Sequence, residues 1–188
     1  MATTGPLAAS RQYLADTARA YSALFFLDSP AAGALLLAST FAYPNIGASG
    51  LLAALVGLAT ARLFRFADVR TPVFVLNSLL VGLSLGAFYQ LGPHLIVLVV
   101  FGALLAVIAS AALADMFWRH ERLPVLVITF LLVAAITALV ARQLSDLSPF
   151  IGYSEFTIGW LPYWANEFLS LLGATFFTIH PVAGAAVL

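Results

Sequence analysis

The sequence contains no cysteine and no lysine, and only 9% of its 188 residues are charged. Without cysteine the chain has no disulfide framework, no thiolate nucleophile and no thiolate metal ligand. Its eight basic residues are all arginine and balance eight acidic residues, so the formal net charge is zero. The arginines never cluster densely, and a nucleic-acid partner is therefore not expected.

Motifs for catalysis and for metal binding are missing as well. The three histidines, His94, His120 and His180, are isolated and have no carboxylates at the spacing of metal ligands. No catalytic serine motif and no glycine-rich phosphate loop occurs in the sequence. We therefore expect no enzyme activity, no metal site and no cofactor.

Hydrophobic residues make up 63% of the chain, and the mean hydropathy is +1.05. A soluble domain carries roughly 25% charged residues, so this chain cannot cover itself with a polar surface. The N-terminal residues are not expected to form a cleavable signal, because Arg11, Asp16 and Arg19 interrupt any apolar core there. The composition predicts an all-α polytopic membrane protein whose surroundings are a lipid bilayer.

Proline and polar clusters divide the chain into apolar segments. A helical stretch over 6–27 mixes charged and apolar residues, which indicates an interfacial segment that continues into a short half-helix. Ser29 is suited to cap the next helix, and Pro30 to its first turn. The predicted membrane spans are 30–43, 46–64, 71–91, 95–114 and 123–140. The longest connection, 142–164, is predicted to be interfacial.

One stretch of the sequence nearly repeats. Residues 23–34 and 174–185 agree at seven of twelve positions, and both contain F-F-x-x-x-P-x-x-G. Such a repeat is typical of transporters built from two inverted copies. We therefore predict three regions: a first five-span repeat over 1–145, an extracytoplasmic connection over 146–164, and the start of a second repeat over 165–188. On this interpretation the chain is a fragment or truncated product that supplies one wall of a pathway and does not conduct alone.

The distribution of arginine predicts the orientation of the spans. With the N-terminus in the cytoplasm, seven of the eight arginines lie on the cytoplasmic side, and only Arg142 lies outside. An odd number of spans also places a second copy in the opposite orientation, as an inverted repeat requires. We expect an integral protein of the inner or plasma membrane.

A few polar and aromatic residues inside the predicted spans are candidates for a pathway. Asn77 is explained either by a hydrogen bond to a neighbouring helix or by support for irregular backbone beside a polar pathway. Thr129 and Thr137 are expected to bond the carbonyl one turn back. Phe26 and Phe177, which occupy equivalent positions of the repeat, serve either as packing residues or as pore walls.

Four stretches resemble motifs of the urea transporter family, in the family's order. Phe25-Phe26-x-x-x-Pro30-x-x-Gly33 is similar to the family's Q-V-x-F-x-N-N-P-x-x-G, and the stretch 176–184 resembles the opening of its second half. Residues 76–83, L-N-S-L-L-V-G-L, are similar to F/Y-N-G-x-L-V-G-L. Residues 123–130, L-P-V-L-V-I-T-F, are similar to L-P-x-L-T-x-P-F. The resemblance covers nearly all of residues 18–188.

The resemblance implies a channel-like facilitator in which two inverted five-span halves enclose a narrow pore for urea, and it suggests a homotrimer. Aromatic and aliphatic slots and a row of acceptor oxygens pass a flat, neutral amide while apolar walls exclude hydrated ions. The resemblance also implies that Phe26 and Leu80 line the slot and that Asn77 holds the turn beside this slot. The full set of pathway candidates is Phe26, Leu76, Asn77, Leu80, Val127, Thr129, Phe130 and Phe177.

Several family positions differ in this chain. Leu76 replaces an aromatic residue, Ser78 replaces glycine, Val127 replaces threonine and Thr129 replaces proline. Two alternatives to urea transport therefore stay open. One is a divergent facilitator of another small uncharged solute such as ammonia or water, and the other is a non-conducting membrane protein that keeps the fold for assembly.

Overall fold

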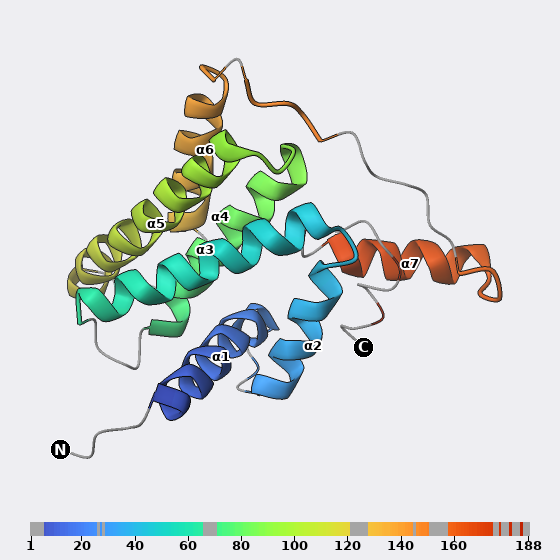
Figure 1. Ribbon diagram of the computed structural model, residues 1–188, viewed down its shortest axis with the longest axis horizontal. Coiled ribbons are helices and arrows are strands. Elements are labelled where there is room, and N and C mark those ends of the chain that lie inside the picture. Colours follow the sequence, from blue (N-terminus) through green and yellow to red (C-terminus); the bar gives the residue numbers. More distant parts are fainter. Residues whose placement is uncertain are drawn as a thin grey trace.

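The computed structural model describes residues 6–25, 27, 29–65, 71–120, 128–144, 146–150, 158–174, 177, 181 and 185. In this part of the chain the regular elements are helical (Figure 1). They are α1 (Pro6–Ser22), the short 3-10 helix η1 (Ala23–Phe25), α2 (Pro30–Thr40), α3 (Pro44–Leu63), α4 (Thr71–Phe88), α5 (Pro93–His120), α6 (Ile128–Ala141) and α7 (Tyr163–Ala174).

Proline begins several of these helices, because a residue in the first turn needs no N–H donor. Helix α2 begins at Pro30, and the hydroxyl of Ser29 accepts a hydrogen bond from the backbone N–H of Ala32 at 3.3 Å. This confirms the predicted cap and helix start. Helices α3 and α5 likewise begin at Pro44 and Pro93.

The five predicted spans correspond to helices α2 to α6, with shifted ends. Helix α3 and residues Pro93–Met116 of α5 are long and apolar enough to cross a membrane, whereas α2, α4 and α6 contain shorter apolar stretches. Eleven residues of α2 extend only about 17 Å, which is too short for a bilayer. Helix α5 continues to His120, beyond the predicted end at 114, and the start of the fifth span lies outside the described residues.

Helices α3 and α4 pack closely because glycine lies where they meet. A Cβ atom on Gly82 would lie 2.5 Å from the carbonyl oxygen of Ser49, and one on Gly86 would lie 2.9 Å from that of Asn45. The side-chain amide of Asn45 donates to the carbonyl oxygens of Gly86 and Tyr89, so it satisfies carbonyls at the end of α4. Small residues of this kind let membrane helices approach without side chains between them.

Helix α5 packs against both α3 and α4 and also contacts α6. The hydroxyl of Ser78 donates to the carbonyl of Ala103 at 3.0 Å. A Cβ atom on Gly102 would lie 2.9 Å from Val81 of α4 and 3.1 Å from the methyl group of Thr137 of α6. Thr137 bonds the carbonyl of Val133 at 2.9 Å, as the sequence predicts.

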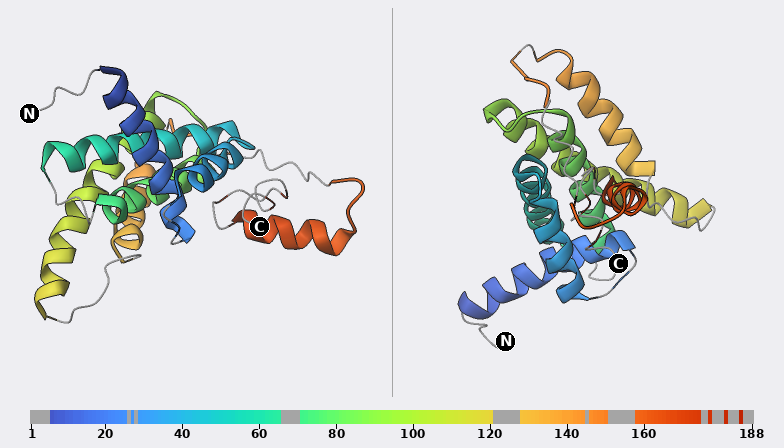
Figure 2. Two further views of the ribbon diagram at one scale, coloured as in Figure 1. Left: turned by 90° about the horizontal axis from the view of Figure 1, so that it is seen from below. Right: turned by 90° about the vertical axis from the view of Figure 1, so that its right-hand side faces the viewer.

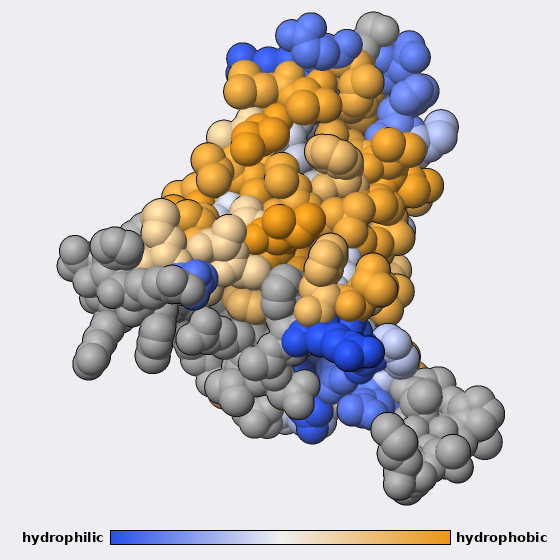
Figure 3. All heavy atoms as spheres, turned by 90° about the vertical axis from the view of Figure 1, so that its left-hand side faces the viewer, coloured by the Kyte–Doolittle hydropathy of each residue, from blue (hydrophilic) through white to orange (hydrophobic). Residues whose placement is uncertain are grey.

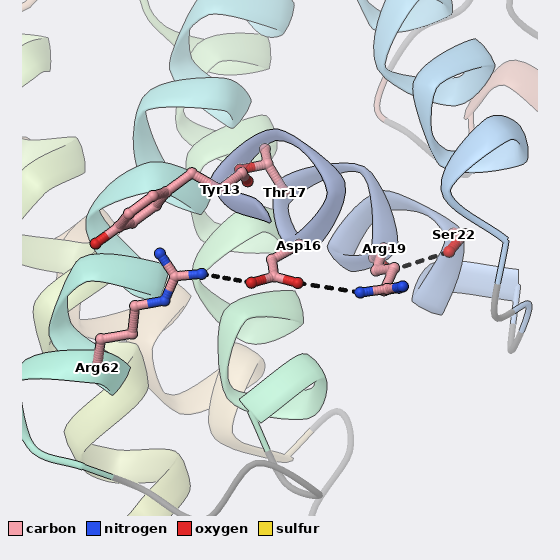
Figure 4. A network of polar contacts seen from close by, with 6 residues as sticks. All are labelled: Tyr13, Asp16, Thr17, Arg19, Ser22 and Arg62. Atoms are coloured by element: carbon pink, nitrogen blue, oxygen red, sulfur yellow. Dashed lines mark hydrogen bonds and ion pairs between the residues drawn. The ribbon is translucent and has the colours of Figure 1, made fainter. Parts of the chain in front are cut away.

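A charged network fastens α1 to the end of α3 (Figure 4). The carboxylate of Asp16 forms an ion pair with Arg62, and a second one with Arg19 at 3.2 Å. The ring of Tyr13 lies 3.6 Å from the guanidinium carbon of Arg62. These contacts hold α1 beside the bundle while its other face keeps Leu14 exposed.

At the opposite end of the bundle the chain after α6 returns to the end of α4. The backbone N–H of Gln90 donates to Ser148 at 2.9 Å, and that of Phe150 donates to Phe88 at 2.9 Å. The ring of Phe150 meets the edge of Tyr43, with ring centres 6.4 Å apart. The ends of α4 and α6 therefore lie on one side of the bundle, as alternating spans require.

The surface also has the pattern of a membrane protein. An apolar belt covers the middle of the face drawn in Figure 3, and hydrophilic residues gather toward its two ends. Helix α5 alone exposes Val97, Phe101 and Ile108. Exposed apolar area of this extent is suited to contact with lipid. Helix α7 lies to one side of the other helices (Figure 2).

Candidate functional site

Helix α4 carries three of the predicted pathway residues. Leu76 and Asn77 are buried, whereas Leu80, one turn further on, is partly exposed. The side-chain nitrogen of Asn77 donates to the hydroxyl of Ser110 on α5 at 2.9 Å. The structural interpretation of Asn77, a hydrogen bond to a neighbouring helix, is thereby confirmed. Its side-chain oxygen Oδ1 is buried and has no hydrogen-bond partner within the described part of the chain.

Helix α6 begins with two further candidates. Thr129 is completely buried, and its hydroxyl has no hydrogen-bond partner among the described residues. The expected bond to the carbonyl one turn back is therefore not observed there, and residue 125 lies outside the described part of the chain. Phe130 is partly buried. Val127, another candidate, also lies outside the described residues.

Phe177 contacts residues of α4 and α6, which are far from it in sequence. Its ring centre lies 6.2 Å from that of Phe130, with the ring planes inclined by 56°. Its side chain also packs against the buried cluster that contains Leu79 and Leu83 of α4. The backbone of Phe177 is left-handed, with φ of 59°, which is unusual for a bulky residue. Its equivalent in the repeat, Phe26, lies outside the described residues.

The aromatic pair and the buried oxygens differ in what they offer a solute. Phe130 and Phe177, which we call the ring pair, present flat apolar faces that suit a planar neutral molecule and disfavour a hydrated ion. Asn77 and Thr129 carry hydrogen-bonding atoms, but both side chains are buried. Among the described residues no group of three histidines and carboxylates could hold a metal ion. The arrangement suits selection by shape and hydrogen bonding.

Sequence reasoning missed Ser110, the hydrogen-bond partner of Asn77. A signal was available, because Ser110 is the only polar side chain among residues 95–114. A lone polar residue in a membrane helix usually faces another helix and not the lipid. The sequence contained no indication of which helix that would be.

We expect Asn77→Leu to lower the thermal stability of the protein in detergent. The change removes the hydrogen bond between α4 and α5, and interhelical bonds of this kind contribute about 1 kcal/mol. A melting curve of the purified variant checks this. Ser84→Ala is a matched control, because the buried hydroxyl of Ser84 bonds only the carbonyl of Val81 in its own helix. Equal melting temperatures for Asn77→Leu and the parent protein would mean that Asn77 does not stabilise the fold.

Comparison with known proteins finds one family. The model of the urea transporter family matches residues 14–188 of this chain, which include every candidate pathway residue. A search of curated proteins finds no match.

Proposed function

The chain belongs to the urea transporter family, and from this we propose that it forms part of a channel-like pathway for urea or a similar small neutral amide. Membership of the family makes it an integral membrane protein of a transporter class. Transport is passive in this proposal: the solute moves down its own gradient, with no coupled ion. Following the family resemblance, we also propose that the protein assembles as a homotrimer.

The observation that carries this proposal is the ring pair. Phe130 ends one family-like motif and Phe177 belongs to another, and their rings lie 6.2 Å apart although the residues are 47 positions apart in sequence. In this proposal the outer faces of these contacting rings form the apolar surface along which a planar molecule without its water shell moves. Leu80 is the third partly exposed candidate and would extend this surface along α4.

We further propose that residues 1–145 are one repeat and that residues 165–188 belong to a second. The offset of 151 between the two copies relates the end of α1 at Ser22 to position 173, and α7 ends at Ala174. It also relates Pro30 to Pro181, and both residues are helical. In this proposal the second repeat provides the opposite wall of the pathway.

Solute flux in liposomes tests the function. Two proteins are reconstituted: this chain alone, and this chain extended through a second five-span repeat, which we call the two-repeat protein. We expect the two-repeat protein to pass urea well above the lipid background. Ammonia and water form the comparison panel, and a protein that passes either of them but not urea would be a facilitator of another solute. Lack of flux for all three would favour a role in assembly.

The orientation is a separate proposal, with the N-terminus in the cytoplasm. Because the chain has no cysteine, single cysteines at the exposed positions 65, 116 and 148 report it without background. We expect an impermeant thiol reagent to label positions 65 and 116 only from the cytoplasmic side and position 148 only from outside. Labelling of position 65 from outside would reverse the orientation.

A further inference from the structure

Two arginines share one carboxylate at the end of α3 (Figure 4). Asp16 forms an ion pair with Arg62 of α3 through one of its oxygens and with Arg19 of its own helix through the other. Asp16 therefore neutralises the charge of Arg62 only in part. The side chain of Arg62 is 29% exposed, so its charge can act on groups outside the protein.

Arg65 adds another positive charge one turn further on. Its side chain is exposed and forms no ion pair among the described residues. Its backbone is left-handed, with φ of 53°, and its N–H donates to the carbonyl of Arg62 at 3.1 Å where the helix ends. Glycine is the usual residue at such a position, because it adopts this conformation without strain. An arginine there indicates that the side chain itself has a use.

An exposed apolar stripe on α3 leads to these two arginines. Leu55, Ala59 and Leu63 are exposed and recur every four residues, so they share one face of the helix, which we call the α3 stripe. Arg62 belongs to the same face, because it follows Leu55 by seven residues. The stripe extends about 12 Å along the helix axis, close to half the thickness of the hydrocarbon core of a bilayer. Its length therefore suits an acyl chain within one leaflet.

Tyr13 and Asp16 hold the guanidinium group of Arg62 in place. The ring of Tyr13 lies 3.6 Å from the guanidinium carbon, and the carboxylate of Asp16 accepts a hydrogen bond from one terminal nitrogen. The other terminal nitrogen forms no hydrogen bond with the residues drawn in Figure 4. A guanidinium group has five N–H donors in a planar arrangement that matches the oxygens of a phosphate. Arg62 is therefore oriented by the protein and still has donors for a phosphate.

We propose that Arg62 and Arg65 bind the phosphate of an anionic phospholipid and that one of its acyl chains lies along the α3 stripe. A zwitterionic lipid has the same phosphate but adds a cationic amine, which the positive charge at this end of α3 disfavours. Free phosphate meets the same charge but gains nothing from the apolar stripe. This lipid site does not depend on which solute the protein transports.

Quenching of a fluorophore by spin-labelled lipids in vesicles tests the proposal. Because the chain has no cysteine, Leu55→Cys allows a single bimane group to be attached at the end of the α3 stripe that is remote from the arginines. Two vesicle samples contain phosphatidylglycerol and phosphatidylcholine in the same proportions. The same amount of lipid carries a nitroxide on its acyl chain, and it is phosphatidylglycerol in one sample and phosphatidylcholine in the other. We expect labelled phosphatidylglycerol to quench as a lipid enriched at least about fivefold beside α3, the equivalent of the attraction to one arginine.

Variants in the Leu55→Cys background separate the lipid site from a general attraction of anionic lipid to the protein. Arg65→Gln should lower the enrichment by about fivefold, because it removes one charge and breaks no ion pair with a described residue. Arg142→Gln is the matched control, since it removes another exposed arginine that lies after α6, and the enrichment should stay unchanged. Bimane attached through Phe101→Cys, on the exposed surface of α5, should be quenched equally by the two lipids.

Four results would overturn the proposal. Equal quenching by the two labelled lipids at position 55 would mean that α3 does not prefer an anionic lipid. Weak quenching by both lipids there would mean that protein, and not lipid, covers the α3 stripe. An unchanged enrichment in Arg65→Gln would mean that this arginine does not bind the headgroup. Loss of the enrichment when inorganic phosphate replaces chloride at constant ionic strength would mean that the arginines form a site for free anions.

Discussion

Gly33→Ala is expected to disrupt the packing of α1 against α2 and to destabilise the protein. An added Cβ atom would overlap the carbonyl oxygen of Ala18 and lie 2.5 Å from the carbonyl carbon. These are backbone atoms of another helix, so no side chain can turn aside to make room. Overpacking typically costs 1–3 kcal/mol, and a clash between two backbones belongs at about 3 kcal/mol or above.

The sign of this effect is informative, because helix propensity acts in the opposite direction. Alanine is better than glycine inside a helix by about 1 kcal/mol, so Gly33→Ala would stabilise α2 if the crossing were loose. We expect a lower yield and a clearly lower melting temperature in detergent. Gly159→Ala is the matched control, since a Cβ atom there meets nothing within 4 Å. An unchanged or raised melting temperature for Gly33→Ala would mean that the two helices do not cross this closely.

Phe130→Ala is expected to remove most of the selectivity for urea in the two-repeat protein. The change deletes one face of the ring pair and leaves Phe177 exposed to the widened space. A hydrophobic pocket discriminates against one methylene group by about 10–200-fold, so the ratio of urea to 1,3-dimethylurea permeability should fall at least about tenfold. Stopped-flow light scattering of proteoliposomes measures both solutes.

Leu131→Ala provides the control for this change. Leu131 is the next residue on α6 and is 60% exposed, so it faces away from the ring pair. The ratio of urea to 1,3-dimethylurea permeability in Leu131→Ala should equal that of the parent two-repeat protein. If Phe130→Ala and Leu131→Ala have the same ratio, the ring pair does not select the solute.

Local signals in the sequence predicted the start of α2 correctly. Ser29 and Pro30 have capping and helix-starting roles that depend only on their own backbone, and both were predicted correctly. The five apolar segments likewise appear as α2 to α6. The observed ends of these helices differ from the predicted ones. Helix α5, for example, continues through charged residues as far as His120, whereas composition alone predicts an end at 114.

Contacts between distant segments were predicted only in part. The repeat marks Gly33 as part of a motif, but its reason, the carbonyl of Ala18 across the helix crossing, depends on tertiary structure. Ser110 was missed for the same reason, because its partner Asn77 lies on another helix. The family resemblance singled out Phe130 and Phe177 as candidates, and the fold brings their rings together. The roles of these residues in transport stay predictions.

Urea equilibration across liposomes that contain the two-repeat protein tests the central claim most directly. Liposomes loaded with labelled urea are diluted into urea-free buffer with no ion gradient, and the reverse gradient is measured in parallel. We predict rapid movement in both directions that stops when the concentrations are equal, with no effect of an imposed sodium or proton gradient. Flux no faster than that of protein-free liposomes, or accumulation of urea against its own gradient, would contradict a passive urea pathway.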